Sequence, residues 1–325
     1  MKAVHCREPG GAEVLEIVEI PRPTIAPSHV LVRNFATALN RADILQRRGL
    51  YPPPPGDSDI LGLEFAGEVA EVGSSVRELK VGDRVFGLTG SGGYAEFLPV
   101  HEALCLPIPD NLPYDLAAAV PEAFYTAHDA IFTLGKLQAG ETLLVHAGAS
   151  GVGTAAIQLG CAFGAQVFAT AGSAEKVKLC TELGAVKAVN YREEDFAAAL
   201  LQSMDAPIVD VVLDLVGASH WEGNLRCLRL HGRLLVVGLL AGTKVEVDLG
   251  VILRKRLRVL GTTLRSRTLA EKVAVTRAFA ADALSRLAAG ELRPILDRVY
   301  PLEEVSQAHE RMEQNLNLGK IVLRM

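Results

Sequence analysis

The 325-residue sequence predicts an α/β protein with two domains, a small β-barrel followed by a doubly wound parallel sheet. Three observations lead to this prediction. Short β-branched runs separated by Gly and Pro fill the chain to about residue 124. From about residue 125, apolar strands alternate with helical segments, and a glycine-rich turn joins the first of these strands to the first helix.

The first part of the chain is expected to form short strands joined by turns. Segments 30–33, 64–73 and 83–87 have the composition of such strands, and Gly82 marks a tight turn before the last of them. Segment 51–56 contains a run of prolines, which excludes a helix and predicts a stiff loop. This pattern is typical of a small barrel.

The second part alternates strands with helices, as a parallel sheet covered on both faces requires. Strands are expected at 142–148, 165–171, 186–190, 209–215 and 233–240, and helices at 152–163, 173–183, 193–203 and 219–228. A further strand at 257–262 is predicted for the sheet edge. A long helix near 268–289 and a last strand at 319–323 follow.

Composition narrows the class of protein. Hydrophobic residues make up 49% and charged residues 22%, as in a folded globular chain, and the net charge of -5 argues against nucleic acid as a partner. We find no apolar run of the roughly 20 residues that a membrane helix needs. The first residues lack the apolar core of a signal peptide, so a cytoplasmic location is expected. Five scattered cysteines without a C-x-x-C pair are expected to be reduced thiols.

The glycine-rich turn carries the chemistry of the second part. The run Ala149-Ser150-Gly151-Val152-Gly153, with Ala156 after it, matches the G-x-G-x-x-G/A fingerprint between a strand and a helix. Glycines there let backbone N–H groups approach a pyrophosphate at a helix N-terminus, where the helix dipole favours negative charge. A dinucleotide-binding site is therefore predicted.

The end of the next strand decides which dinucleotide is expected. An NAD site places a carboxylate there for the ribose 2′-hydroxyl, whereas Gly172 and Ser173 follow this strand. Lys176 supplies positive charge and Tyr191 a phenolic donor, so NADPH is predicted. Two alternatives stay open: Ser173 also suits a helix N-cap, and Glu175 competes as a ribose ligand.

Four segments carry a resemblance to a known family: 40–51, 61–67, 81–85 and 146–158. With them, the whole chain resembles the zinc-free quinone oxidoreductases of the medium-chain dehydrogenase/reductase superfamily. The resemblance implies a GroES-like β-barrel catalytic domain formed by residues 1–124 with 267–325. It also implies a Rossmann-fold NADPH-binding domain at 125–266.

Departures from the zinc-dependent relatives suggest the chemistry. Where those enzymes have a histidine ligand, this chain has Leu63, and their first cysteine ligand aligns near Asn40. Only Cys105 lies in the region of their structural zinc lobe. Because zinc needs three or four N, S or O donors, we expect no metal site. An acceptor that is already easy to reduce is then the expected substrate class.

The resemblance also implies roles for individual residues. Asn40 and Asp43 would lie at the nicotinamide end of the cleft, and the Tyr51 hydroxyl would face the substrate carbonyl. Asp43 has the alternative of a helix or turn cap, and Tyr51 that of a packing residue. The remaining positions implied to contact the cofactor are Thr126, Gly238, Leu239, Leu264 and Asn317.

The sequence therefore predicts NADPH-dependent, zinc-independent reduction of a small-molecule quinone, in a homodimer paired through the edge strand at 257–262. Two alternatives remain. One is an NADPH-dependent reductase of enoyl or alkenal double bonds. The other is an NADPH-binding protein with a structural or regulatory role and little turnover.

Overall fold

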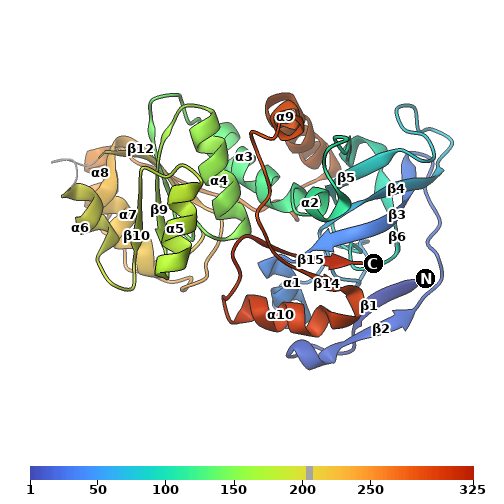
Figure 1. Cartoon of the computed structure of the whole chain (residues 1–325). Helices are drawn as coiled ribbons and strands as arrows, with labels where there is room; N and C mark the ends of the chain where they lie inside the picture. The colour runs from blue at the N-terminus through green and yellow to red at the C-terminus, as the bar shows by residue number, and fades with distance from the viewer. Residues whose placement is uncertain (203–207) are drawn as a thin grey trace. The chain divides into compact units, whose positions relative to one another are not determined.

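The computed structural model describes residues 1–202 and 208–325. It divides into two compact units (Figure 1). Unit 1 comprises Met1–Tyr125 and Leu264–Met325, and unit 2 comprises Thr126–Thr263. The C-terminal segment thus returns to the unit formed by the N-terminal one. The sequence-based division placed the second domain at 125–266.

Unit 1 contains the strands and helices that frame its polar interior. Its strands are β1 (Lys2–Cys6), β2 (Leu15–Glu19), β3 (His29–Ala38), β4 (Glu64–Val72), β5 (Arg84–Leu88), β6 (Phe97–His101), β7 (Cys105–Pro107), β14 (Leu296–Pro301) and β15 (Lys320–Arg324). Its helices are α1 (Arg41–Arg47), α2 (Tyr114–Ala118), α9 (Leu269–Ala288) and α10 (Val305–Glu313).

The ten-residue strand β3 organises the main sheet of unit 1. Along one edge it pairs with β4; along the other, its first half pairs with β6 and its last residues with β15, all antiparallel. β15 also pairs with β14 in parallel. Because β6 and β15 pair with different parts of the same edge of β3, the C-terminal strand β15 joins the sheet formed by the N-terminal strands. This pairing places Lys320, at the start of β15, next to the end of β3.

Unit 2 alternates strands and helices along the chain. Its strands are β8 (Thr142–Val145), β9 (Gln166–Ala171), β10 (Lys187–Asn190), β11 (Val209–Asp214), β12 (Leu228–Val236) and β13 (Arg258–Gly261). Its helices are α3 (Thr126–His128), α4 (Gly151–Ala162), α5 (Ala174–Glu182), α6 (Phe196–Leu201), α7 (Trp221–Cys227) and α8 (Leu249–Lys255).

The sheet of unit 2 is parallel, in the order β10-β9-β8-β11-β12-β13. Helices α4 and α5 cover one face (Figure 1), whereas α6 and α7 contribute to a hydrophobic cluster with Leu144, Phe168 and Val212. The strand order reverses direction between β8 and β11. In an open parallel sheet, such a reversal leaves a crevice at the carboxyl ends of the two strands, where ligands bind.

Several element bounds differ from the expected ones for local reasons. β12 ends at Val236, not at residue 240: the Asp214 carbonyl oxygen accepts the last ladder hydrogen bond from the Val237 N–H and also accepts from the Gly238 N–H, and the pairing goes no further. Helix α6 begins at Phe196 because the Asp195 side chain caps it; the expected helix end at residue 203 lies outside the described residues.

Two further findings concern the chain as a whole. All five cysteines are free thiols. Among the described residues, none of the helices has the length and apolar character needed to cross a membrane.

Candidate functional site

The glycine-rich turn lies at the carboxyl end of β8. Ser150 is the N-cap of α4, and its Oγ accepts a hydrogen bond from the Gly153 N–H at 3.1 Å. A Cβ atom on Gly153 would lie 2.3 Å from the Ala147 carbonyl oxygen, so only glycine fits this position. The first-turn N–H groups of Gly151 and Val152 have no acceptor inside the helix and point to its N-terminal end. This end therefore provides N–H donors and a positive dipole for an anion.

The end of β9 places four of the predicted cofactor residues near one another: Gly172, Ser173, Lys176 and Tyr191. Ser173 is the N-cap of α5 and accepts from the Lys176 N–H at 3.3 Å, which shows the cap geometry that the sequence suggested for it. Gly172 lies under Tyr191, since a Cβ on Gly172 would be 2.7 Å from the Tyr191 hydroxyl oxygen. The Tyr191 side chain is itself 40% exposed. Glycine at this position leaves room for the phenol.

The other predicted cofactor residues fall in both units. Thr126 begins α3, and Ala149 is buried in the glycine-rich turn. Gly238 and the exposed Leu239 follow β12, so they lie at the carboxyl ends of the parallel strands, as the glycine-rich turn does. Leu264 and Asn317 belong to unit 1, where the Asn317 side-chain N–H donates to the Gly319 carbonyl at 2.9 Å.

Together, the residues of unit 2 fit a dinucleotide that carries a 2′-phosphate. The close-packed glycine and the helix N-terminus suit the pyrophosphate. The segment after β9, Gly172-Ser173, carries no carboxylate that would repel a phosphate. Lys176 on α5 supplies a cation, and Tyr191, directly after β10, supplies a hydroxyl.

A buried network of polar side chains lies at the carboxyl ends of β8, β9 and β11. The Asn224 side-chain N–H donates to Asp214 Oδ2 at 3.0 Å, so its Oδ1 accepts from His146 Nε2 at 2.6 Å. His146 Nδ1 then accepts from the Thr170 hydroxyl at 2.8 Å. Burial lowers the pKa of His146 to about 4. His146 is thus a neutral, fully hydrogen-bonded structural residue.

In unit 1, Asn40 and Asp43 begin helix α1. Asp43 is completely buried, and its carboxylate accepts from the N–H groups of Asn40 at 2.7 Å and Gly62 at 3.2 Å. Burial is the main cause that raises the pKa of Asp43 to about 6, opposed by the Asn40 hydrogen bond and Lys320. Asp43 therefore makes the helix cap that was one of its two expected roles.

A chain of hydrogen bonds connects Asp43 to α10. Arginine has only donors, so Arg47 Nη1 donates to His309 Nδ1 at 3.2 Å, and His309 Nε2 carries the proton that it donates to the Tyr94 oxygen at 3.3 Å. The Tyr94 hydroxyl in turn donates to Asp43 Oδ2 at 3.2 Å. Burial lowers the pKa of His309 to about 3, which keeps this histidine neutral.

Beside this chain lies a buried ion pair. Lys320 Nζ is 2.8 Å from Glu64 Oε1, and their side chains are 5% and 0% exposed. Asn40 lies between them: its Oδ1 accepts from Lys320 at 2.6 Å and its Nδ2 donates to Glu64 at 2.7 Å. Asn40 thus orients a buried charge pair.

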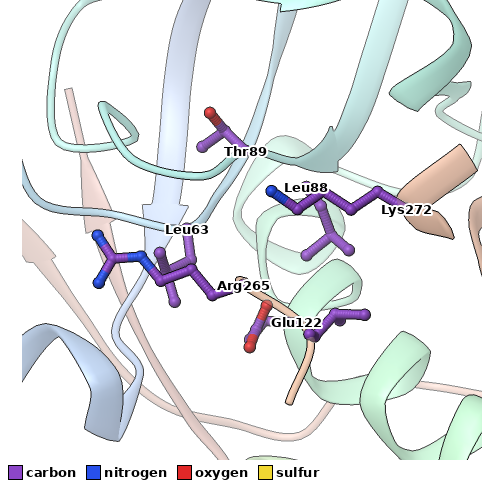
Figure 2. Close-up of a pocket in the computed structure, with 7 residues that line it drawn as sticks. Leu63, Leu88, Thr89, Glu122, Arg265 and Lys272 are labelled. Carbon is purple, nitrogen blue, oxygen red and sulfur yellow. The ribbon is translucent and has the colours of Figure 1, made fainter. Parts of the chain in front are cut away.

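A cavity of unit 1 opens near this pair (Figure 2). The enclosed space is about 10 Å³, room for one water molecule, and its walls are Leu63, Leu88, Thr89, Glu122, Leu264, Arg265 and Lys272. Figure 2 shows Lys272 reaching from its helix toward Leu88. The walls thus combine apolar leucine surface with two cations and one carboxyl group.

Arg265 connects the cavity to Tyr51. The guanidinium is 5.2 Å from the centre of the Tyr51 ring, and its Nη1 donates to the Tyr51 carbonyl oxygen at 3.2 Å. Other N–H groups of Arg265 donate to Gly90 and Gln46. Burial is the main cause that raises the pKa of Tyr51, so this phenol stays protonated and able to donate a hydrogen bond.

Sequence reasoning gave no role to several residues that the structure places here: Glu64, Glu122, Arg265, Lys272 and Lys320. A signal was present for some of them. Glu64 stands between Leu63 and Phe65, and Lys320 precedes Ile321, so each is a charge at the edge of an apolar strand. A buried charge needs a partner, but the sequence alone does not say which one.

Metal ligands do not gather in the part of the chain that the structure describes: no three His, Cys, Asp or Glu side chains there could hold an ion together. Leu63 is buried and forms part of the cavity wall.

Comparisons with known proteins add independent information. A family model for the alcohol dehydrogenase GroES-like domain matches residues 26–110, and one for zinc-binding dehydrogenases matches residues 151–280. A quinone oxidoreductase from Pseudomonas aeruginosa is 36% identical over 316 residues, covering 97% of this chain and 96% of the relative. The quinone oxidoreductase of Rattus norvegicus is 33% identical over 329 residues, covering 99% and 97%.

Solved structures of reductases have the same fold over nearly the whole chain. The quinone oxidoreductase of Escherichia coli in complex with NADPH superposes with a TM-score of 0.90 at 32% identity, over 100% of both chains. The CurK enoyl reductase superposes with a TM-score of 0.89 at 27% identity, over 100% of this chain and 99% of the other.

Proposed function

Because the chain belongs to the quinone oxidoreductase family of medium-chain dehydrogenases/reductases, we propose that it reduces a quinone with NADPH and without zinc. The observation that carries the proposal is the cavity of unit 1, whose leucine walls stand beside Arg265 and Lys272. The enclosed space is too small for a ring, so a flat quinone would lie against the leucine side chains at the mouth of the cavity, where nearby cations stabilise the negative charge that develops on a quinone oxygen during reduction.

NADPH is the cofactor of this proposal. Gly151, Val152 and Gly153 would hold its pyrophosphate, and Ser173, Lys176 and Tyr191 its 2′-phosphate, as the fit of unit 2 supports. When bound, NADPH supplies a hydride, which is an electron pair with a proton. The chain's own part is to orient this cofactor through backbone donors and to distinguish it from NADH through charge.

In unit 1, one residue is proposed to contact the acceptor, and two others are proposed to position neighbouring side chains. Tyr51 is assigned to the acceptor carbonyl, where its protonated hydroxyl donates a hydrogen bond. Asn40 and Asp43 are positioning residues in this proposal, because hydrogen bonds to Glu64, Lys320, Tyr94 and the α1 backbone engage their side chains.

Zinc independence is proposed from the chemistry of the cavity wall. Leu63 presents a hydrocarbon side chain that cannot bind a metal ion. A quinone needs no Lewis acid to accept a hydride, because its reduced ring is aromatic.

Reduction of an activated double bond is the second candidate, and the structural likeness to an enoyl reductase favours it. A conjugated enal also develops negative charge on its carbonyl oxygen, so the same cations would serve it. The two candidates differ in the acceptor alone.

Initial rates test these candidates directly. We would measure oxidation of NADPH and of NADH by the purified protein, with EDTA, using 1,2-naphthoquinone, 1,4-benzoquinone and an α,β-unsaturated aldehyde. NADPH turnover with quinones that survives EDTA is the expected result. Turnover with the aldehyde alone would move the function to double-bond reduction. Tight NADPH binding without turnover would favour a structural or regulatory role.

A homodimer is part of the same proposal. β13 is the last strand in the order of its sheet, and Val259 on it and Leu253 on the preceding helix are 40% and 78% exposed. A second copy pairing edge to edge would cover this apolar surface. Light scattering during gel filtration should therefore give a dimer, and Val259→Asp should halve the molar mass.

A further inference from the structure

Glu122 is an acidic residue in the cavity wall with no role in the proposal above. It lies in the π-helical turn Pro121–Tyr125, and its backbone N–H donates to Glu64 Oε2 at 2.8 Å. The hydrogen bond fixes the backbone, so that the half-buried side chain takes its place among Leu63, Leu88 and the other wall residues. Figure 2 shows this carboxyl group on the Arg265 side of the cavity.

The charges around Glu122 come from every element packed against it. Glu64 on β4, Asp43 on α1, Lys320 on β15 and Arg265 before α9 act on its carboxyl group, Lys272 on α9 shares its cavity, and Glu122 in turn affects Tyr51. Lys320 is already paired with Glu64. Arg265 is fixed by neutral oxygens and the Tyr51 ring. Within the described residues, the Glu122 carboxyl group makes no ion pair with any of these cations.

Burial first, and then the neighbouring Glu64 carboxylate, raise the pKa of Glu122 to about 8, against the opposing effect of Lys320 and Arg265. Asp43 differs, because donors from Asn40, Gly62 and Tyr94 surround its carboxylate and leave it an acceptor. At neutral pH, Glu122 therefore holds a proton at the wall of a cavity, and a carboxylic acid in such a place can donate it.

We propose that Glu122 is the acid that protonates the oxygen of the acceptor as it is reduced, an inference that rests on the proposed reductase function. The hydride that NADPH would supply leaves its carbon with the bonding electron pair and forms a new C–H bond on the acceptor, and the π electron pair displaced by this bond ends on the carbonyl oxygen of the acceptor. A new O–H bond forms there while the O–H bond of Glu122 breaks. The Glu122 carboxylate then recovers a proton from water. Arg265 and Lys272 stabilise the negative charge while it is on either oxygen.

The pH profile of kcat/KM for the quinone, at saturating NADPH, tests this role. For the wild type, we expect a plateau below about pH 7 and a fall above about pH 8, where Glu122 loses its proton. Glu122→Gln should lower kcat/KM by about 100-fold and abolish that fall. Glu122→Asp should keep a pH-dependent limb, which the amide cannot, but with a lower rate and a shifted limb position, because the shorter side chain moves the acid.

A matched control is Glu303→Gln, the same substitution at an exposed glutamate paired with Lys2. It should keep both the rate and the profile of the wild type. Infrared spectra of the cofactor-free protein give a readout besides activity. The carbonyl band of a protonated carboxylic acid should disappear near pH 8 in the wild type, and this band should be missing from Glu122→Gln.

The outcomes separate this inference from the proposed function. Quinone turnover by the wild type, with the same rate and the same alkaline fall in Glu122→Gln, overturns the role of Glu122 and leaves the reductase function standing. Absence of quinone and enal turnover at every pH overturns the reductase function, and the role of Glu122 with it. If Glu122→Gln fails to fold, the profile of Glu122→Asp decides: an unchanged limb position and rate would contradict the proposal.

Discussion

Lys320 and Glu64 form an ion pair of 2.8 Å across 256 residues of sequence, with both side chains buried. The pair joins the last strand of the chain to β4. Asn40 hydrogen-bonds to both partners and so ties the start of α1 to the same point. The integrity of unit 1 should therefore depend on this contact.

Removing one partner of the pair tests this dependence. Lys320→Met should lower the free energy of unfolding by about 3–5 kcal/mol, because it leaves the Glu64 carboxylate buried without a counter-charge. Lys2→Met is the matched control: Lys2 and Glu303 are also 2.8 Å apart, but 49% and 55% exposed. The control should cost less than about 1 kcal/mol. Equal losses in urea unfolding would show that burial is not the cause.

Lys176 should bind the 2′-phosphate of NADPH. Lys176→Ala should weaken NADPH binding by about tenfold and leave NADH binding unchanged, because the lost contact is with a charged group that NADH lacks. Fluorescence titration of both cofactors measures this. Lys178→Ala, in the same helix and 78% exposed in an ion pair with Glu182, should affect neither. An equal loss for NADPH and NADH would remove Lys176 from the 2′-phosphate site.

Tyr51 should contribute a hydrogen bond to the quinone. Tyr51→Phe is expected to raise KM for the quinone by about two- to tenfold, the effect of one neutral hydrogen bond, with no change in NADPH affinity. Tyr114→Phe is a suitable comparison, because its hydroxyl donates to Glu68 at 2.7 Å and belongs to another part of unit 1. Unchanged kinetics in Tyr51→Phe would leave Tyr51 as a packing residue beside the proline loop.

Two buried histidines should make unit 2 sensitive to acid. Burial lowers the pKa of both His146 and His220 to about 4. The unfolded chain binds these protons at about pH 6.5 and the folded chain only near pH 4, so the free energy of unfolding falls as the pH drops through this range. Each histidine contributes a slope of about 1.4 kcal/mol per pH unit.

The single tryptophan, Trp221, lies in unit 2 and reports its unfolding by fluorescence. His220→Gln should reduce the slope between pH 6.5 and 4 by the share of one histidine. His231→Asn is the control, because His231 is exposed and its φ of 65° is a conformation that asparagine tolerates. An unchanged slope in His220→Gln would contradict the assignment of acid sensitivity to this residue.

Much of unit 2 could be predicted from the sequence, because its information is local. The strand β8, the turn through Gly151 and Gly153, and the helix α4 follow from apolar runs, glycines and a serine cap within some twenty residues. The strand at the sheet edge, β13, was also predicted in its place beside the others. Periodicity and capping act between near neighbours, and a single sequence records them directly.

The cavity of unit 1 could not be predicted in this way. Asp43 was left between a cap and a catalytic role, and its hydrogen bond from the Asn40 N–H shows the cap. Glu122 and Lys272 are unremarkable in the sequence, and they share a cavity only because β4, β5, the turn at Glu122 and the C-terminal segment fold together.

The sequence by itself therefore determined the order of strands and helices, the dinucleotide turn and the family. The tertiary structure decided which buried charges are paired, as Lys320 and Glu64 are, and which carboxyl group is left in the cavity wall with no ion pair to any described residue, as Glu122 is. The physical reason is that burial and the distance between charges, which govern the pKa of a side chain, arise from contacts between segments far apart in the chain.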